Sequence, residues 1–296
     1  MVLEAILSAQ EAESHPLDMF FLGFGVSTLG LWLAFYIFPK EASNWLLFLA
    51  AFALEPLLLR LFYLEERYDI TFARPTIWQR HQNVIVDYLL LFFGMVIAFS
   101  FWYTVLPQPL TNIMFENQIA EVTRIQGLRA TLTGAVIGAG ATGALNLGGA
   151  ISSKFQTLNF IMANNLRLLF LFIAFSFIFG AGAILLLVWN AAVVGVAIGN
   201  LIRTEIVATH LAGTLTAYFT ALPVSFFAFF AHGIFEVMGY FIGAIAGGIL
   251  SVAIVKRHYN SPHFGLLVKD VVLLTALSAI LIIFGAWVEV YITPLL

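Results

Sequence analysis

The sequence contains no cysteine among its 296 residues. Disulfide bonds, thiolate metal sites and cysteine nucleophiles are therefore excluded, and the redox compartment cannot be read from the chain. Charged residues are also scarce, because they make up 10% of the chain, whereas soluble domains carry about 25%. So few charges cannot coat a water-facing surface, so much of the surface must face lipid. The net charge of −3 argues against nucleic acid as a partner.

The N-terminal segment lacks the basic residues of a secretory signal peptide. Residues 1–18 contain no Lys or Arg, and the apolar run that follows them is long and has no small-residue cleavage site. We therefore expect the first apolar segment to be retained as a membrane helix.

Long apolar runs dominate the rest of the chain, which is 61% hydrophobic, has 30 Phe and has a mean hydropathy of +0.99. A helix needs about 20 apolar residues to cross a bilayer core about 30 Å thick. The runs are continuous, whereas the strands of a membrane barrel alternate every two residues. The sequence thus predicts an all-α, polytopic transmembrane helical bundle of about seven spans, at residues 19–38, 45–64, 85–106, 166–188, 211–230, 233–255 and 269–292.

Two further apolar segments affect the count of spans. Residues 190–203 are apolar, but about 14 residues are too few to cross the membrane, so we interpret them as a short re-entrant or interfacial helix, or as an extension of the neighbouring helix. Residues 131–151 are long enough, but Gly and Ala dominate them, so their hydrophobic drive to enter the membrane is weak.

Basic residues cluster in two of the predicted loops, one after the second span and one before the last: Arg67, Arg74, Arg80, Lys256, Arg257 and Lys269. The positive-inside rule places both loops in the cytoplasm. The sequence therefore predicts a multi-pass protein of the cell membrane with its N-terminus in the cytoplasm and its C-terminus outside. A topology with seven spans places both of these loops on the cytoplasmic side.

The longest predicted connection, residues 107–165, contains an amphipathic pattern. Pro107 and Pro109 end the third predicted span, and apolar residues then recur at helical spacing from Ile119 to Leu132, with charged residues between them. This pattern is typical of an amphipathic helix that lies on the outer leaflet or packs on the bundle. An ordinary loop helix with a half-buried face fits equally well.

Gly138, Gly140 and Gly143 match the spacing of the dinucleotide-binding fingerprint. That fingerprint requires strands that alternate with helices, and an acidic residue about 20 positions later that binds the ribose. No Asp or Glu occurs between Glu121 and Glu205, and no such series of strands is predicted. We therefore favour close helix packing or a hinge at these small residues, and we predict no cofactor.

Gly239, Gly243 and Gly247 are spaced by four in the predicted sixth span, and Gly195 and Gly199 repeat that spacing. Small residues four apart form a ridge that lets two helix backbones approach closely. Packing within the chain is the favoured interpretation, and a homo-oligomer through Gly239, Gly243 and Gly247 is the alternative.

His232 and Glu236 are the strongest candidate functional residues. They lie four apart, so on a helix they share one face, and apolar runs flank them on both sides. An ionisable residue in such a place is costly and usually faces the bundle interior or a wet cavity. The pair fits a structural polar contact, a proton or transport path, or a weak metal site with His210 as a third ligand.

Polar residues also mark both ends of the predicted fourth span. Asn164, Asn165 and Arg167 open it and Asn190 closes it. Asn residues cap helices or hydrogen-bond between helices in lipid, and Arg167 is long enough to reach the interface.

Two further polar pairs are secondary candidates. Arg203 and Glu205 flank the short apolar segment, and Glu55 and Arg60 bracket Pro56 in the second span. Glu55 next to a mid-helix proline suggests a kink with a buried acid, and Arg60 is a candidate counter-charge.

Three polar motifs follow one another along the C-terminal half: Asn164-Asn165, Asn190 followed by Gly195 and Gly199, and His232-Gly-Ile-Phe-Glu236. In order and spacing, residues 85–292 resemble the stage II sporulation protein M-like family of integral membrane proteins. Two positions depart from the family pattern, since Ala191 stands where a Gly is usual and Ala231 where a Pro is frequent.

The resemblance implies a five-span membrane domain at residues 85–296 that includes the extracytoplasmic segment 107–165. Residues 1–84 are then an added two-helix extension with a basic cytoplasmic loop. The resemblance also implies a non-enzymatic membrane subunit that works with other membrane proteins, because founding members act in an envelope-remodelling complex during engulfment.

Three functions therefore compete. The first is a non-enzymatic subunit or scaffold of a membrane complex, in which His232, Glu236, Asn164, Asn165 and Asn190 form a polar core between helices. The second is a transporter or channel that uses His232 and Glu236, with residues 190–203 as a half-helix. The third, and least favoured, is an intramembrane metal-dependent hydrolase.

Overall fold

The computed structural model describes residues 15–71, 77–125, 127, 147–179, 183–209, 214–257 and 264–292. Inside helices, the description omits the side chains of 62–71, 77–80, 147–153, 179, 208–209, 214–217, 225 and 228–232. Within the described ranges every regular element is a helix: α2 (Leu17–Ile37), α3 (Ala42–Thr71), α4 (Ile77–Val105), α5 (Gln108–Met114), a stretch at 116–125, α7 (Leu147–Phe179), α8 (Ala183–Thr209), α9 (Thr214–Val255) and α10 (Phe264–Tyr291).

Seven helical segments in the described residues are long and apolar enough to cross a bilayer: Leu17–Ile37, Ala42–Leu61, His81–Val105, Lys154–Ile178, Ala183–Val207, Gly233–Val255 and Phe264–Tyr291. Hydrocarbon offers the backbone no hydrogen-bond partners, so each crossing segment must pair its own N–H and C=O groups, which a helix does. The predicted all-α membrane bundle is confirmed, and the seven crossing segments among the described residues agree with the predicted number of spans. Two of the predicted spans, however, are wrong.

The first correction concerns the predicted fourth span and the re-entrant helix. The apolar run 166–188 is not one helix, because α7 ends at Phe179 and α8 begins at Ala183. Residues 190–203 are the interior of α8, which is long enough to cross, so they are not a short re-entrant segment. No charged residue interrupts the run from 168 to 188, so its length and composition did not reveal that one helix ends and another begins within it.

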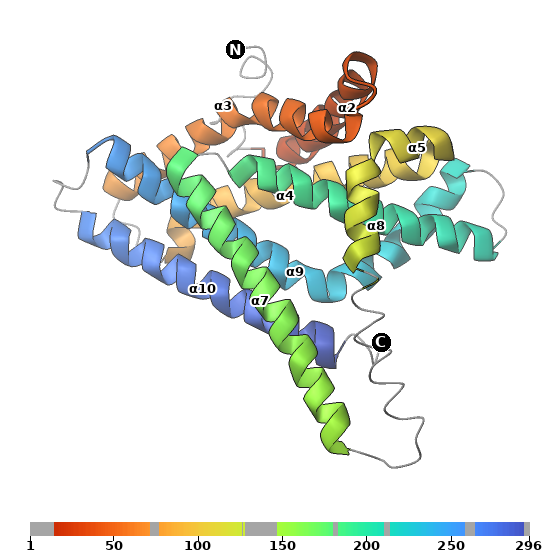
Figure 1. Ribbon diagram of the computed structural model, residues 1–296. Helices are drawn as coiled ribbons and strands as arrows, with labels where there is room; N and C mark the ends of the chain where they lie inside the picture. Colours follow the sequence, from red (N-terminus) through yellow and green to blue (C-terminus); the bar gives the residue numbers. More distant parts are fainter. Residues whose placement is uncertain are drawn as a thin grey trace.

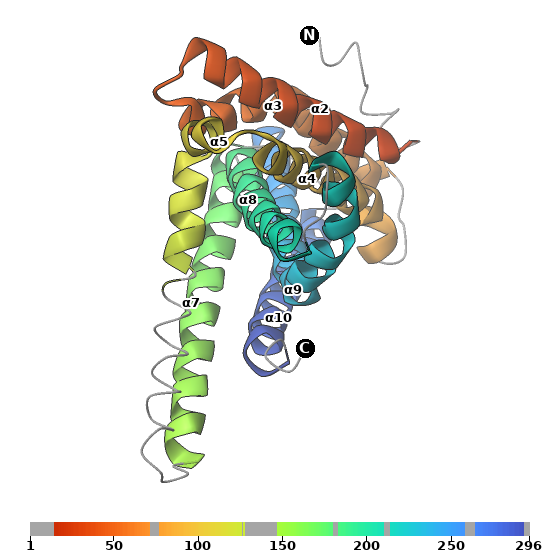
Figure 2. The same ribbon diagram turned by 90° about the vertical axis from the view of Figure 1, so that its right-hand side faces the viewer.

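The second correction concerns the predicted span 211–230, which belongs to the same 42-residue helix, α9, as the predicted span 233–255. The span at 233–255 is itself confirmed. The helix runs through residues 230–233 without a break, so no connection there divides it into two spans. At 1.5 Å per residue α9 is about 63 Å long. Its first turns (teal in Figures 1 and 2) lie at an angle to the rest, as expected for a helix that contains Pro223.

The helix α9 is the centre of the bundle. In its crossing segment 83% of the residues are buried, whereas the corresponding share is 22% for α7 and 33% for α10. The helices α7, α8 and α10 pack around it, and α4 lies against α8 and α9. Figures 1 and 2 show that α7 crosses this group obliquely and that its N-terminal part extends well beyond the other helices.

The helices α2 and α4 cross in direct backbone contact. A Cβ at Gly23 would strike the carbonyl of Leu91, and a Cβ at Gly94 would strike the carbonyl of Phe20. Only glycine allows so close an approach at these two positions. This crossing attaches the first helix to the rest of the bundle.

The predicted amphipathic helix after α5 exists at residues 116–125 and packs on the bundle. The Ser43 hydroxyl donates to Gln118 Oε1 at 2.8 Å and accepts from the backbone N–H of Asn117 at 3.0 Å. The segment is thereby held against the start of α3. The rest of the pattern, which includes Leu128 and Leu132, lies outside the described residues.

Candidate functional site

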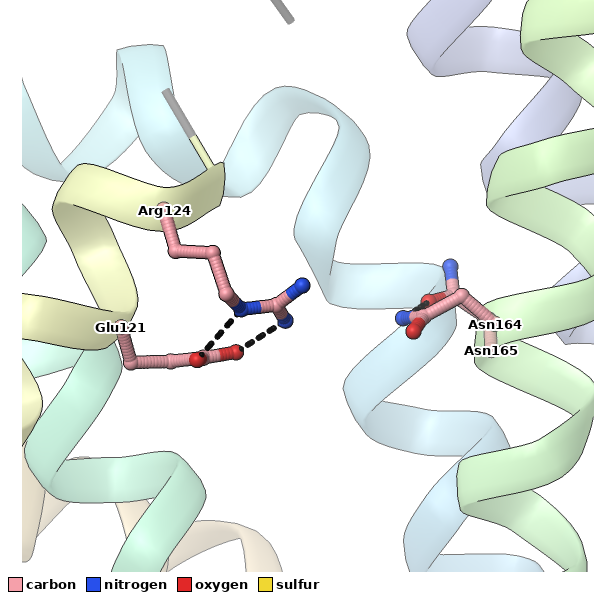
Figure 3. Close-up of polar contacts among 4 residues, drawn as sticks. All are labelled: Glu121, Arg124, Asn164 and Asn165. Carbon is pink, nitrogen blue, oxygen red and sulfur yellow. Dashed lines mark hydrogen bonds and ion pairs between the residues drawn. The ribbon is translucent and has the colours of Figure 1, made fainter. Parts of the chain in front are cut away.

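A hydrogen bond between two predicted site residues joins α7 to α9. Asn165 Nδ2 donates to Glu236 Oε1 at 2.6 Å, although the two residues lie 71 positions apart. Asn164 Nδ2 in turn donates to Asn165 Oδ1 at 3.3 Å. Figure 3 shows both asparagine side chains on α7, directed towards α9. Three of the five residues predicted to form the polar core therefore meet in one chain of contacts.

The surroundings of Glu236 explain why it needs such a donor. Glu236 lies in the crossing segment of α9, where an unpaired carboxylate is costly. The Asn165 amide, which donates to Glu236 at 2.6 Å, supplies a partner that hydrocarbon does not. Asn165 is itself 6% exposed, so its amide also gains a partner that lipid would not supply.

The helix α10 closes the site on its other side. A Cβ at Gly285 would lie 2.8 Å from Glu236 Cγ, so the α10 backbone passes directly over this side chain. One turn further along α9, the buried Tyr240 stacks on Phe172 of α7 with their ring centroids 5.1 Å apart. Glu236 and Glu289 both lie within electrostatic reach of the Tyr240 hydroxyl. The carboxylate of Glu236 thus lies where α7, α9 and α10 meet.

The predicted glycine ridge continues along the same helix. A Cβ at Gly239 would lie 2.8 Å from Ile282 Cγ1 of α10. At Gly243 and Gly247 a Cβ would strike Leu169 and the carbonyl of Ile173, both on α7. The ridge therefore packs α9 against two helices of its own chain. Homo-oligomer formation through these glycines stays a prediction.

The other two members of the predicted core do not join this contact. Asn190 Nδ2 donates to the carbonyl of Leu186 at 2.7 Å, one turn back on α8. His232 lies on α9 one turn before Glu236, but its side chain lies outside the description, as does the whole of His210. A His232–Glu236 pair, and a metal site that includes His210, therefore stay predictions. Among the described residues, no group of three His, Asp or Glu is arranged to hold a metal ion.

Arg203 connects the end of α8 to the turn between α4 and α5. Its Nη2 donates to the carbonyl of Leu106 at 2.7 Å and to Thr111 Oγ1 at 3.0 Å, and its guanidinium lies 4.6 Å from the ring centroid of Tyr103. The end of α4 leaves carbonyls without helical partners, and Arg203 satisfies one of them. Its neighbour Glu205 is exposed.

The remaining secondary candidates lie on two helices. Glu55 is half-buried and Arg60 is exposed on α3, which continues through Pro56. Arg167 is exposed on α7, and no described side chain makes an ion pair with it.

Figure 3 also shows an ion pair on the helical stretch at 116–125. Arg124 donates from Nε and Nη2 to the two carboxylate oxygens of Glu121, at 2.8 and 2.6 Å. This hydrogen bonding lowers the pKa of the Glu121 carboxyl below its ordinary value. The pair lies outside the crossing segments and stabilises its own helix turn.

Sequence reasoning missed a buried pair between the beginnings of α4 and α10. His81 Nε2 lies 3.8 Å from Asp270 Oδ2, and the two side chains are 0% and 4% exposed. Asp87, 0% exposed, lies nearby along α4. His81 fell outside the predicted third span, and Asp270 stands at the very start of the predicted last span, directly after Lys269. Asp87, however, stood inside an apolar run and was a visible signal.

Comparison with known proteins places the described site inside a family region. A family model described as stage II sporulation protein M matches residues 88–294. An uncharacterized protein from Methanocaldococcus jannaschii is 33% identical over 137 residues, which is 45% of this chain and 69% of the relative. No solved structure matches the chain.

Proposed function

Since this chain belongs to the stage II sporulation protein M family, we propose that it is a non-enzymatic subunit or scaffold of a membrane complex. We further propose that it resides in the cell membrane and that its N-terminus is cytoplasmic. The observation that supports a complex most directly is the outward face of α7, which carries polar residues at membrane depth.

The outward face of α7 includes four exposed residues that recur every four, three and four positions, Gln156, Phe160, Ala163 and Arg167, and the exposed Phe170 follows them. This is the spacing at which one helix packs along another. The face is turned away from the bundle, because Asn165 and Leu169, on the other side of α7, are buried. It combines a small residue and polar side chains, which are typical of helix–helix contacts in membranes.

Arg167 makes this face unsuitable for lipid alone. It lies near the middle of the crossing segment Lys154–Ile178, about 20 Å along the helix from Lys154 at 1.5 Å per residue. Charged residues at such depth almost always face protein or water and pair with another group. The described part of the chain supplies no such partner, so we infer that a helix of another subunit covers Arg167 with an acidic or amide side chain.

The transport hypothesis has lost part of its support. It rested on residues 190–203 as a half-helix, and these residues are part of the full-length helix α8. Glu236 is also bonded to Asn165 and covered at Gly285 by α10. These contacts fit a carboxylate that joins helices.

Site-specific cross-linking from the outward face of α7 tests the proposal directly. A photo-reactive amino acid at Ala163 or Phe170 on α7, in the native host, should cross-link to one defined membrane protein. Leu29 on α2, which is 62% exposed to the surroundings, is the matched control position and should not give this adduct. The same partner should co-purify with the wild-type chain in mild detergent. The Arg167→Leu variant should reduce the recovery of this partner at least fivefold. The control variant Lys40→Gln, in the connection between α2 and α3, should leave the recovery unchanged.

Three results would contradict this proposal. Equal cross-linking from Ala163 and Leu29, with most of the chain remaining at the size of a single protomer, would show that α7 has no specific partner. An adduct of twice the chain mass would indicate a homo-oligomer instead. A pH-dependent ion flux in proteoliposomes that Glu236→Gln abolishes would favour a transporter.

A further inference from the structure

A groove lies between α7 and α10 on the surface that faces the membrane. It encloses about 360 Å³ and is lined by Leu158 and Met162 of α7 and by Ile280, Ile283, Phe284 and Trp287 of α10. Every lining side chain is aliphatic, aromatic or thioether. The groove is open to its surroundings, and it is separate from the outward face of α7.

The groove leads to a cation at one end. Lys154, Leu158 and Met162 lie on successive turns along one face of α7, and Tyr291, Trp287 and Phe284 follow one another in the same way on α10. Lys154 Nζ lies 5.7 Å from the ring centroid of Tyr291. Lys154 begins the α7 crossing segment and Tyr291 ends that of α10, so this end of the groove lies at the membrane boundary.

Lys154 is available to an anion. It is exposed, and no described carboxylate lies within ion-pair distance of its ammonium. Tyr and Trp side chains such as Tyr291 and Trp287 collect at the level of lipid headgroups. A basic residue between membrane helices at that level attracts anionic headgroups.

The occupant must match an apolar groove that has a single cation beyond one end. An acyl chain that ends in an anionic headgroup has this distribution of apolar and charged groups. About 12 Å of α7 separates Lys154 from Met162, at 1.5 Å per residue. A single hydrocarbon chain is thin enough to fit.

We propose that the groove between α7 and α10 binds one hydrocarbon chain of an anionic phospholipid, and that Lys154 holds the phosphate of the same molecule. The lipid fills the space where α7 diverges from α10 and so supports the oblique course of α7 (Figure 1). This inference does not depend on the function of the chain as a subunit.

Native mass spectrometry of the purified full chain, with phosphatidylglycerol or phosphatidylcholine added in turn, tests the site. We expect phosphatidylglycerol to remain bound in preference, at a stoichiometry near one. Lys154→Gln should lower that preference about fivefold, as expected for one basic side chain near a membrane surface. Lys40→Gln, which removes another exposed lysine, should leave it unchanged.

Leu158→Trp tests the hydrocarbon part of the site, because the larger side chain fills the groove. It should remove the bound lipid of either headgroup, whereas Leu29→Trp on α2 should not. A phospholipid with a photo-reactive group in its acyl chain should label wild-type peptides that contain Met162 or Trp287, which keeps the test independent of the folding of the variants. The proposal would be overturned if wild type and Lys154→Gln retained both lipids equally, or if the label were spread evenly over α2 and α10. It would also be overturned if a second copy of the chain, instead of a lipid, occupied the groove.

Discussion

At the scale of single residues, the bundle depends on a few polar side chains that have found partners across helices. Asn165 with Glu236 and His81 with Asp270 each join two helices that are distant in sequence. In hydrocarbon the alternative for each of these groups is no partner at all. Such residues therefore determine which helices can be neighbours.

Asn165→Leu should lower the free energy of unfolding by about 1–3 kcal/mol, because Glu236 then loses the amide that donates to it. Glu236→Gln should cost less, since a glutamine oxygen can still accept that hydrogen bond. The measurement is reversible unfolding in mixed micelles, with Asn159→Leu at an exposed position of α7 as the control. Equal losses for Asn165→Leu and Asn159→Leu would show that the contact contributes nothing.

At the scale of elements, the helices differ in how they approach one another. The crossing of α2 and α4 relies on backbone contact at glycines, whereas α7 leaves the bundle along part of its length. The division of the chain into a two-helix extension at 1–84 and a domain at 85–296 stays a prediction. The close crossing shows that α2 packs tightly on α4 in either case.

Gly23→Ala and Gly25→Ala form a matched pair that tests the crossing. A Cβ at Gly23 collides with the α4 backbone, whereas a Cβ at Gly25 meets nothing within 4 Å. We expect Gly23→Ala to lower stability by about 1–3 kcal/mol through overpacking. Gly25→Ala should be neutral or stabilising, since Ala favours helix by up to about 1 kcal/mol over Gly. Thermal unfolding of both variants in detergent gives the comparison, and similar melting temperatures would contradict the close crossing.

At the scale of the whole molecule, long-range contacts show which helix ends share a side of the membrane. Ser43 with Gln118, Arg203 with Leu106, and Lys154 with Tyr291 join ends on one side. His81 with Asp270 joins ends on the other side. An arrangement in which seven successive spans alternate in direction brings the two partners of each of these four contacts to the same side of the membrane.

The cytoplasmic side can be tested by labelling of single cysteines in the cysteine-free chain. The clustered basic residues predict that the side of His81 and Asp270 faces the cytoplasm. A membrane-impermeant maleimide should therefore label Lys40→Cys and Glu116→Cys in intact cells, and should label Lys256→Cys only after the membrane is permeabilised. The reverse pattern would invert the predicted orientation.

Prediction from sequence succeeded where each residue carries its own energetic signal. The cost of placing charge in hydrocarbon and the gain from placing Phe there add up residue by residue, so composition and run length were enough to predict a membrane bundle of seven helices. The same cost marked Glu236, Asn164 and Asn165 as residues that require partners.

Only the tertiary structure decided where helices end, which side chains meet and which surfaces are left open. The end of α7 at Phe179, the continuity of α9, the bond from Asn165 to Glu236, the pair of His81 and Asp270 and the groove beside Trp287 are examples. Each depends on contacts between segments that are distant in the chain. Preferences added up over neighbouring residues do not include the energy of such contacts, because that energy arises only once the helices have packed.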